Sequence, residues 1–350
     1  MQRVSGKVST VLFSPHLHDK FSLHFAMWNV VIALLPSGLA GVYYFGLPAL
    51  KVITISVITA LITELLMNLM TKNRITILDG SAIITGLLFA YNLPPVAPWY
   101  LVIVGSFFAI SIVKWAFGGL GYNFMNPALG GRIFVIIAWS NIMVGHWSYP
   151  LQRFIEKGLS FTLASKQIIL PDAITSASPL TVLKSGGFKA IKEGGFDYWS
   201  LFVGKIPGCI GETSKLAILI GGIYLLALGI IQWEIPVIYI GTVAFLSWLL
   251  GGLPFGMGIF TGNALFHILS GGLFLGAFFM ATDYVTSPIS FKGRVLFAIM
   301  LGILTVVIRL FGGYPEGVSY AIVIMNIFVP LIDRYLKDRI YGYKKGGANA

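Results

Sequence analysis

Charged side chains and cysteine are scarce in this sequence. Only 11% of the 350 residues are charged and 57% are hydrophobic, whereas a soluble domain carries roughly 25% charged residues. That balance excludes an ordinary soluble domain and indicates a membrane protein with several spans. The single cysteine, Cys209, excludes an internal disulfide and cannot by itself ligate an iron–sulfur cluster. An electron carried by this chain alone therefore needs an organic cofactor.

Acidic residues are fewer than basic ones, 13 against 24, so the formal net charge is +11. The basic residues form no stripe or arginine-rich arm of the kind that binds nucleic acid, and we expect no nucleic-acid partner.

The first 20 residues contain no short apolar core with a cleavage site, so we expect no removable signal peptide. Neither a Walker-type phosphate loop nor a glycine fingerprint between strand and helix occurs.

Apolar runs long enough to cross about 30 Å of hydrocarbon recur along the chain. They cover roughly residues 22–46, 48–70, 79–94, 98–118, 126–145, 214–232, 235–251, 260–281, 292–312 and 317–335. We therefore predict an all-α, polytopic membrane protein with about ten transmembrane helices. Two sets of five spans would make two inverted five-helix repeats. Residues 1–145 would form the first half, residues 146–213 a loop and residues 214–350 the second half.

The distribution of Lys and Arg predicts the orientation. Basic residues follow the second span, at Lys72 and Arg74, and they also precede the ninth span and follow the last one. The alternate connections, such as residues 92–98 and 252–257, have none. By the positive-inside rule both termini are cytoplasmic and the loop of residues 146–213 lies outside the cytoplasm, because long loops cross largely regardless of charge.

The third and eighth apolar runs differ from the others. Residues 79–94 and 270–284 are short and rich in Gly, Ser and Thr, and they occupy corresponding places in the two halves. Glycine there lets the backbone unwind or lets a flat ligand approach. Unwound backbone at membrane depth is tolerated where it lines a cavity.

Glu64, Lys114, Asp283 and Arg309 are charged residues that fall in or near apolar runs, where a charge costs at least about 2.5–3.5 kcal/mol. Lys114 and Arg309 lie near span ends, so we expect them to snorkel to the interface. Trp115, also at a span end, is expected to anchor there. Asp283 adjoins the eighth run and is a candidate for an ion path.

Three histidines, His16, His18 and His24, fall close together before the first span. A metal site is one interpretation. With no cysteine and only Asp19 as a nearby carboxylate, we expect interfacial polar residues instead and no metal.

The only long polar segment contains residues 171–183, PDAITSASPLTVL. Asp172 precedes Ser178 by six residues, and two small residues stand directly ahead of that serine. An enzyme that modifies a hydroxyl needs little bulk around it, and Pro179 would keep the backbone there out of a helix. A turn or a helix cap is the alternative, because Asp, Ser and Thr favour such positions.

The pattern Asp-x-x-Thr-x-Ala-Ser, followed by Pro-Leu-Thr, resembles the flavinylation motif of the membrane subunits RnfD and NqrB. The resemblance implies FMN on the Ser178 hydroxyl through a phosphodiester, attached by a flavin transferase, with Asp172 and Thr175 as motif residues. The family usually has Thr at the acceptor and Gly in place of Ser176. Thr175 and Thr181 are alternative acceptors.

Further segments resemble the same family, so the resemblance spans nearly the whole chain. They are the Ser-Pro-His at residues 14–16, the Ala-Leu-Leu-Pro at 33–36, and residues 78–86, 126–132 and 281–288. The chain also lacks the longer N-terminal extension usual in NqrB subunits, which favours RnfD.

The resemblance implies an electron-transfer subunit of an Rnf-type, ion-translocating ferredoxin:NAD oxidoreductase in a prokaryotic plasma membrane. It implies coupling to Na⁺ or H⁺ transport, partner subunits with iron–sulfur clusters and flavin, and a noncovalent riboflavin or FMN between the spans. An NqrB-like subunit that passes electrons to quinone is one alternative. A non-redox channel or transporter built on the inverted repeat is another.

Overall fold

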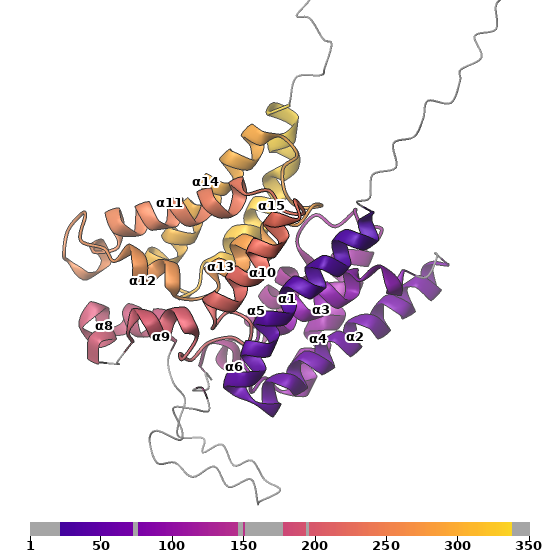
Figure 1. Cartoon of the computed structure of the whole chain (residues 1–350), viewed down its shortest axis with the longest axis horizontal. Helices are drawn as coiled ribbons and strands as arrows, with labels where there is room; N and C mark the ends of the chain where they lie inside the picture. The colour runs from indigo at the N-terminus through magenta and orange to yellow at the C-terminus, as the bar shows by residue number, and fades with distance from the viewer. Residues whose placement is uncertain (1–21, 73–75, 146–149, 151–177, 194–195, 338–350) are drawn as a thin grey trace, which may run out of the picture.

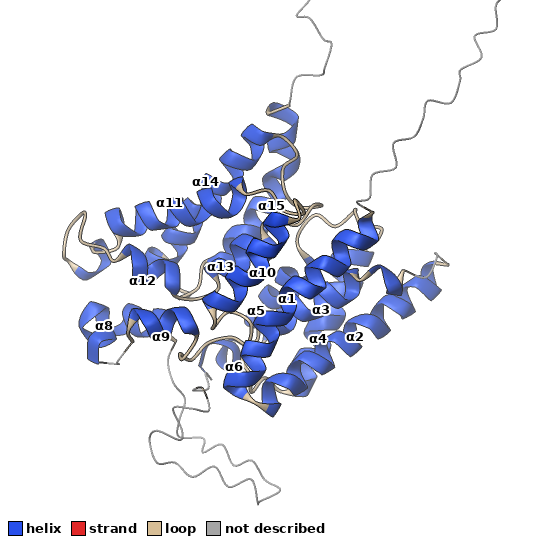
Figure 2. Ribbon diagram, viewed as in Figure 1, coloured by secondary structure: helices blue, strands red, loops and turns tan. Residues whose placement is uncertain are grey.

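The computed structural model describes residues 22–72, 76–145, 150, 178–193 and 196–337, and the regular structure in these ranges is helical (Figures 1 and 2). The elements before the polar segment are α1 (Leu23–Phe45), α2 (Leu47–Thr71), η1 (Ile77–Asp79), α3 (Ser81–Tyr91), α4 (Trp99–Phe108), η2 (Ala109–Trp115), α5 (Pro127–Ala138) and α6 (Ser140–Gly145). Those that follow it are α8 (Pro179–Glu193), α9 (Tyr198–Val203), α10 (Lys215–Ala227), α11 (Glu234–Leu250), η3 (Leu253–Phe255), α12 (Ala264–Leu269), α13 (Leu273–Leu275), η4 (Gly276–Met280), α14 (Phe291–Phe311) and α15 (Val318–Tyr335).

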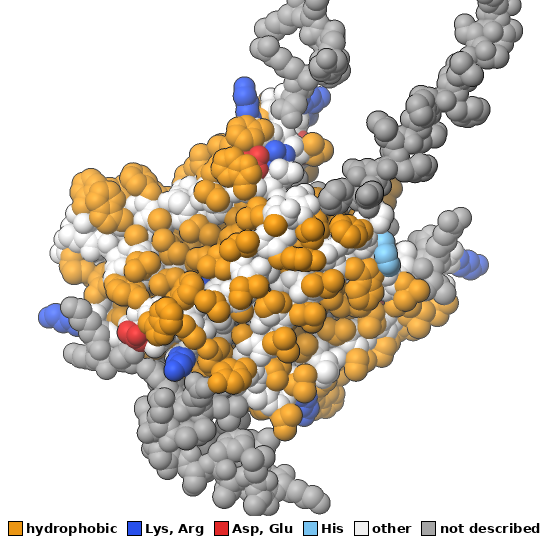
Figure 3. Space-filling model, viewed as in Figure 1, with side chains coloured by type: hydrophobic (Ala, Val, Ile, Leu, Met, Phe, Trp, Pro, Cys, Tyr) orange, Lys and Arg blue, Asp and Glu red, His pale blue; other side chains and the backbone are white. Residues whose placement is uncertain are grey.

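Five helices of the described chain have the length and apolar composition needed to cross a membrane. They are Leu23–Phe45, Leu47–Thr71, Glu234–Phe255, Phe291–Phe311 and Val318–Tyr335. Shorter apolar helices occupy the other apolar runs. Hydrophobic side chains cover most of the visible face, and charged ones lie near its edges (Figure 3). An apolar outer surface of this kind suits lipid, so the fold is that of a multi-pass membrane protein.

Glycines interrupt the third and eighth apolar runs, as expected. Gly80, with φ of +86°, separates the short 3₁₀ turn η1 from α3. Gly271, with φ of +67°, lies where α12 ends and before α13 begins. A side chain at either φ would be strained, so glycine fits both breaks. The π-helical turns η2 and η4 were not expected.

The helices before the polar segment (the first half) and those after it (the second half) pair in similar ways. In the first, α2 packs against α3 and α4; in the second, α11 packs against α12 and α14. The halves meet where α1 packs along α10 and where α5 packs on α15 (Figure 1). Tyr224 of α10 donates a hydrogen bond of 2.6 Å from Oη to Oδ1 of Asn29 on α1.

Helices α8 and α9 lie at the end of the molecule opposite the start of α1 and the end of α15 (Figure 1). Pro179 begins α8, so the expectation that it would keep the backbone out of a helix was wrong. Its fixed φ suits the first helical position, where the missing N–H is not needed. A kink at Gly187, with φ of 66°, divides α8.

Candidate functional site

Ser178 is the residue directly before α8, and its side chain caps that helix. Its Oγ accepts a hydrogen bond of 3.3 Å from the backbone N–H of Thr181 and lies 2.9 Å from the Thr181 Oγ1. The side chain is buried, at 4% exposure. The helix-cap interpretation is therefore confirmed, while the chemical role of the hydroxyl stays a prediction. Asp172 and Thr175 lie outside the described residues.

A small cavity beside Ser178 is lined by charged side chains. Glu212, Lys215 and Glu316 all contribute to its wall. The ammonium of Lys215 donates a hydrogen bond of 2.8 Å to the backbone carbonyl of Glu212. One oxygen of Glu212, Oε1, accepts from the N–H of Cys209 at 3.2 Å. Its other oxygen, Oε2, has no hydrogen-bond partner among the described residues.

Arg132 of α5 connects this cluster across the two halves. Its guanidinium donates to Oδ1 of Asn92 at 2.5 Å and forms an ion pair with Glu316, which follows α14. Burial, helped by the nearby Glu316 carboxylate, raises the pKa of Glu212 to about 7. Burial opposes ionisation of Glu316 too, but the Arg132 charge outweighs it and holds the pKa of Glu316 below its usual value. The two carboxyls of the cluster therefore differ in proton affinity, and Glu212 keeps its proton more readily than Glu316.

Arg309 does not snorkel to the interface, contrary to the expectation. It is 5% exposed, and it donates 2.6 Å and 3.2 Å hydrogen bonds to the backbone carbonyls of His267 and Ser270. These carbonyls are at the end of α12, where a short helix leaves acceptors unpaired. Because the partners are inside the protein, the side chain turns inward.

Lys114 and Trp115 were expected at the interface, and that was wrong as well. The Lys114 ammonium lies 3.0 Å from both carboxylate oxygens of Glu64 and 2.8 Å from Oγ of Ser81. The Trp115 indole donates to Oε2 of Glu64 at 2.9 Å. The side chains of Glu64, Lys114 and Trp115 are all buried. They can be, because the Glu64 carboxylate on α2 accepts hydrogen bonds from both Lys114 and Trp115.

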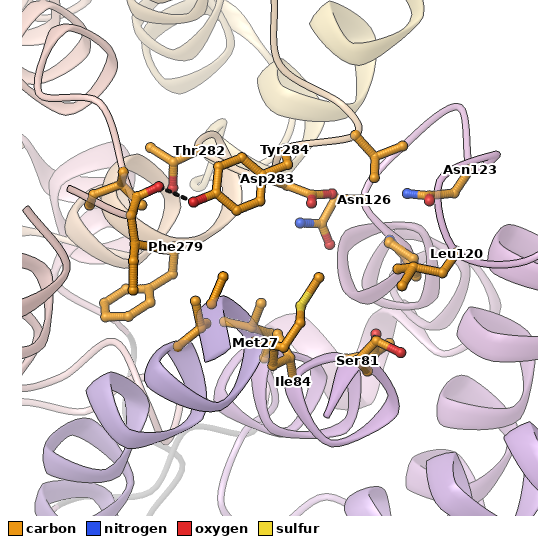
Figure 4. Close-up of a pocket in the computed structure, with 18 of the residues that line it drawn as sticks. Met27, Ser81, Ile84, Leu120, Asn123, Asn126, Phe279, Thr282, Asp283 and Tyr284 are labelled. Atoms are coloured by element: carbon orange, nitrogen blue, oxygen red, sulfur yellow. Dashed lines mark hydrogen bonds between the residues drawn. The ribbon is translucent and has the colours of Figure 1, made fainter. Parts of the chain in front are cut away.

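Asp283 lies in the turn after η4 and lines a cavity of about 90 Å³ between the two halves (Figure 4). Asn126 comes to the same wall from the first half, and Met27 and Ile84 lie opposite. The Asp283 carboxylate accepts a 3.2 Å hydrogen bond from the Thr286 hydroxyl. The structure therefore places this carboxylate where both halves meet.

Within the described chain, no group of three His, Cys, Asp or Glu side chains could hold a metal. His24 packs edge to face on Trp28, while His16 and His18 lie outside the described residues.

Sequence reasoning missed the cluster of Arg132, Glu212 and Glu316. Glu212 and Glu316 lie in connections, where a charge is ordinarily solvated, and Arg132 lies inside α5. The available signal was the scarcity of acidic residues, because in such a chain each carboxylate near an apolar run needs a partner.

The chain resembles known proteins along nearly its whole length. A family profile described as NQR2, RnfD, RnfE family matches residues 10–342. The subunit designated D in the Na⁺-translocating ferredoxin:NAD⁺ oxidoreductase complex of Acetobacterium woodii is 45% identical over 338 residues, which cover 96% of each chain. Its counterpart in the proton-translocating ferredoxin:NAD⁺ oxidoreductase complex of Clostridium ljungdahlii is 42% identical over 347 residues, covering 98% of this chain and 99% of the relative. The counterpart in an ion-translocating oxidoreductase complex of Stutzerimonas stutzeri is 42% identical over 333 residues, covering 92% of each chain.

Proposed function

The chain belongs to the NQR2, RnfD, RnfE family, and from that membership we propose that it is the RnfD subunit of an ion-translocating ferredoxin:NAD⁺ oxidoreductase complex. The observation that carries this function is the identity of 45% and 42% to two such subunits over almost the full length. The name of one relative specifies Na⁺ and the name of the other specifies protons. Sequence identity to these relatives therefore does not decide which ion this chain's complex would move. The other subunits of the complex are its partners.

We propose further that Ser178 carries FMN through a phosphodiester, attached by a flavin transferase, with Asp172 and Thr175 as part of the motif. The position of the hydroxyl supports this, because a phosphate on Ser178 lies at the start of α8, where the helix dipole favours an anion. When bound, the flavin accepts and gives up electrons, and the chain fixes its position and environment.

Covalent flavin is tested by coexpression with a flavin transferase and denaturing electrophoresis under ultraviolet light. We expect a fluorescent band from the wild-type chain, its loss in Ser178→Ala and its retention in Thr181→Val. Thr175→Val is expected to weaken the band, because Thr175 belongs to the motif. Mass spectrometry of the peptide then locates the added mass. A band that survives Ser178→Ala and disappears in one of the threonine variants moves the acceptor there. No band from the wild-type chain rejects covalent flavin.

We propose that the ten apolar segments are ten transmembrane helices in two inverted halves, with both termini cytoplasmic and α8 outside. The shared helix pairings support the repeat. The location of α8 at the end opposite the start of α1 and the end of α15 supports the orientation (Figure 1). Labelling of Ser185→Cys on intact cells by an impermeant maleimide tests this. Labelling of Lys72→Cys instead would reverse the orientation.

Asp283 is proposed to line an ion path at the junction of the halves. Its place on the cavity wall, with polar groups from both halves beside it, supports this role. Unchanged coupled ion transport in Asp283→Asn would refute the role.

A further inference from the structure

Glu212 is a buried carboxyl without an ion-pair partner. The residue is 2% exposed, and none of the ion pairs found in the described chain includes it. Its Oε1 accepts a hydrogen bond from the backbone N–H of Cys209. Its Oε2 has no hydrogen-bond partner among the described residues and is shielded from water. An unpaired charge in such a place is costly, and a buried carboxyl avoids that cost when it keeps its proton.

The neighbour of this unpaired oxygen is a second carboxyl, that of Glu316. The two side chains are in hydrogen-bond contact, and both lie against the pair of glycines that precedes α13. A Cβ at Gly272 would lie 2.5 Å from Oε2 of Glu212, and a Cβ at Gly271 would lie 3.6 Å from Oε1 of Glu316. An ionised carboxylate can only accept hydrogen bonds. Two carboxyls therefore bond to each other only when a proton lies between them.

The positive charges around the two carboxyls are largely occupied by other partners. Arg132 of α5 forms the ion pair with Glu316. The Lys215 ammonium of α10 donates a 2.8 Å hydrogen bond to the backbone carbonyl of Glu212 and does not pair with its carboxyl. The Arg309 guanidinium of α14 donates to two backbone carbonyls at the end of α12. One guanidinium is thus left to neutralise two carboxyls, and two neighbouring carboxyls cannot both ionise easily.

The same contacts form a ring that joins the two halves. Arg132 of the first half holds Glu316 of the second half and donates to Oδ1 of Asn92 at 2.5 Å. The thiol of Cys209 donates to the backbone carbonyl of Asn92 at 3.3 Å, and the N–H of Cys209 donates to Glu212. The remaining step of the ring is the contact between Glu212 and Glu316. A proton on one of these carboxyls completes the ring.

We propose that Glu212 and Glu316 share one proton, carried by Glu212 and donated to Glu316, and that this proton stabilises the contact between the two halves. The proposal requires neither a flavin on Ser178 nor an ion path at Asp283. Burial and the adjacent Glu316 carboxylate raise the pKa of Glu212 to about 7, which agrees with the geometry. Above that pH two carboxylates face one guanidinium, and their repulsion weakens the contact.

The bound proton is tested by infrared spectroscopy of the purified full-length chain in detergent. A protonated carboxyl has a C=O stretching band that an ionised carboxylate lacks. At mildly acidic pH we expect Glu212→Gln to lose the share of this band that belongs to one carboxyl. Glu234→Gln is the matched control and is expected to keep the band, because Glu234 is a buried carboxylate with its own partner, Arg294, at 3.2 Å.

The role of the proton at the junction is tested by thermal unfolding as a function of pH. The unfolded chain releases the Glu212 proton near the ordinary pKa of 4.5, whereas the folded chain keeps it to about 7. The stabilisation is therefore complete below 4.5 and is lost as the pH rises to about 7. We expect the wild-type midpoint to fall through this window relative to that of Glu212→Gln, whose amide donates the hydrogen bond at every pH.

Equal carboxyl bands in the wild-type chain and in Glu212→Gln would overturn the shared proton. Loss of the band together with parallel unfolding curves would overturn the role of the proton at the junction. If Glu212→Gln does not fold, Glu316→Gln decides, because it leaves Glu212 as the carboxylate available to Arg132. Glu212 should then ionise and the same band should disappear, and a band that persists in Glu316→Gln would contradict the sharing.

Discussion

Glu64 and Lys114 form an ion pair that is almost fully buried, with side-chain exposures of 1% and 2%. Removal of water from both charges is costly, and their attraction offsets that cost only when the remaining hydrogen-bond capacity is also used. Ser81 and Trp115 provide those further hydrogen bonds. The four side chains come from α2, α3 and η2, so one cluster connects three elements of the first half.

Loss of one partner from this pair leaves the other as an uncompensated buried charge. We expect Glu64→Ala to reduce the free energy of unfolding by about 3–5 kcal/mol. The measurement is thermal unfolding of the purified protein in detergent. The double variant Glu64→Leu with Lys114→Met is expected to lose less than Glu64→Ala alone, because no charge stays buried.

Lys51→Met is the matched control, since Lys51 lies on the same helix as Glu64 and is exposed. An equal loss of stability in the control and in Glu64→Ala would show that the buried pair contributes nothing specific.

The sequence identified which charges are unusual but not where they point. Glu64 and Lys114 are 50 residues apart, and no local pattern reports that α2 and η2 bring them together. Arg309 was misplaced for the same reason, because its carbonyl partners arise from a break between α12 and α13. The cap at Ser178 could be predicted, since it depends on a local residue type.

At the scale of elements, α2 and α3 pack closely because Gly86 has no side chain. A Cβ built there would lie 2.9 Å from Cα of Val57. The close approach allows the Ser56 hydroxyl to donate a 2.7 Å hydrogen bond to the carbonyl of Gly86. Small residues allow such contacts between membrane helices.

A large side chain at this position must push the two helices apart. We expect Gly86→Leu to destabilise the protein by about 1–3 kcal/mol, because overpacking forces backbone shifts. Gly241→Leu on α11 is the control, since a Cβ at Gly241 meets nothing within 4 Å. Thermal unfolding of both variants is the measurement, and equal midpoints would contradict the packing role of Gly86.

The positions of the helices were largely predictable, because length and apolarity report a span and glycine reports a break. The π-helical turns were not predictable, since a change of hydrogen-bond register inside a helix does not alter the pattern of apolar residues in the sequence. From the sequence, Pro179 was expected to keep the backbone out of a helix. In the structure it is instead the first residue of α8, a position that suits proline.

The whole molecule depends on the contact between its first and sixth apolar segments. Gly221 of α10 lies so close to α1 that a Cβ there would be 2.0 Å from the carbonyl oxygen of Ala33. The Ser37 hydroxyl of α1 also donates a 2.7 Å hydrogen bond to the carbonyl of Gly211, just before α10. The order of the spans was readable from the sequence, but this pairing of the halves was not, because apolar faces look alike.

A side chain at Gly221 should therefore disturb the junction and not merely one helix. We expect Gly221→Leu to cost about 3 kcal/mol or more. It should also increase proteolysis within the connection between the halves. Cleavage at the wild-type rate, together with an unchanged thermal midpoint, would refute the importance of this contact.

The contact between α1 and α10 can form only late in the synthesis of the chain. Ala33 and Gly221 are 188 residues apart (221 − 33), and a ribosome that adds 5–20 residues per second needs roughly 10–40 s to cover that interval. During that interval the face of α1 that later contacts α10 has no partner from that helix. Lipid or the insertion machinery must therefore shield this face until the sixth segment is inserted.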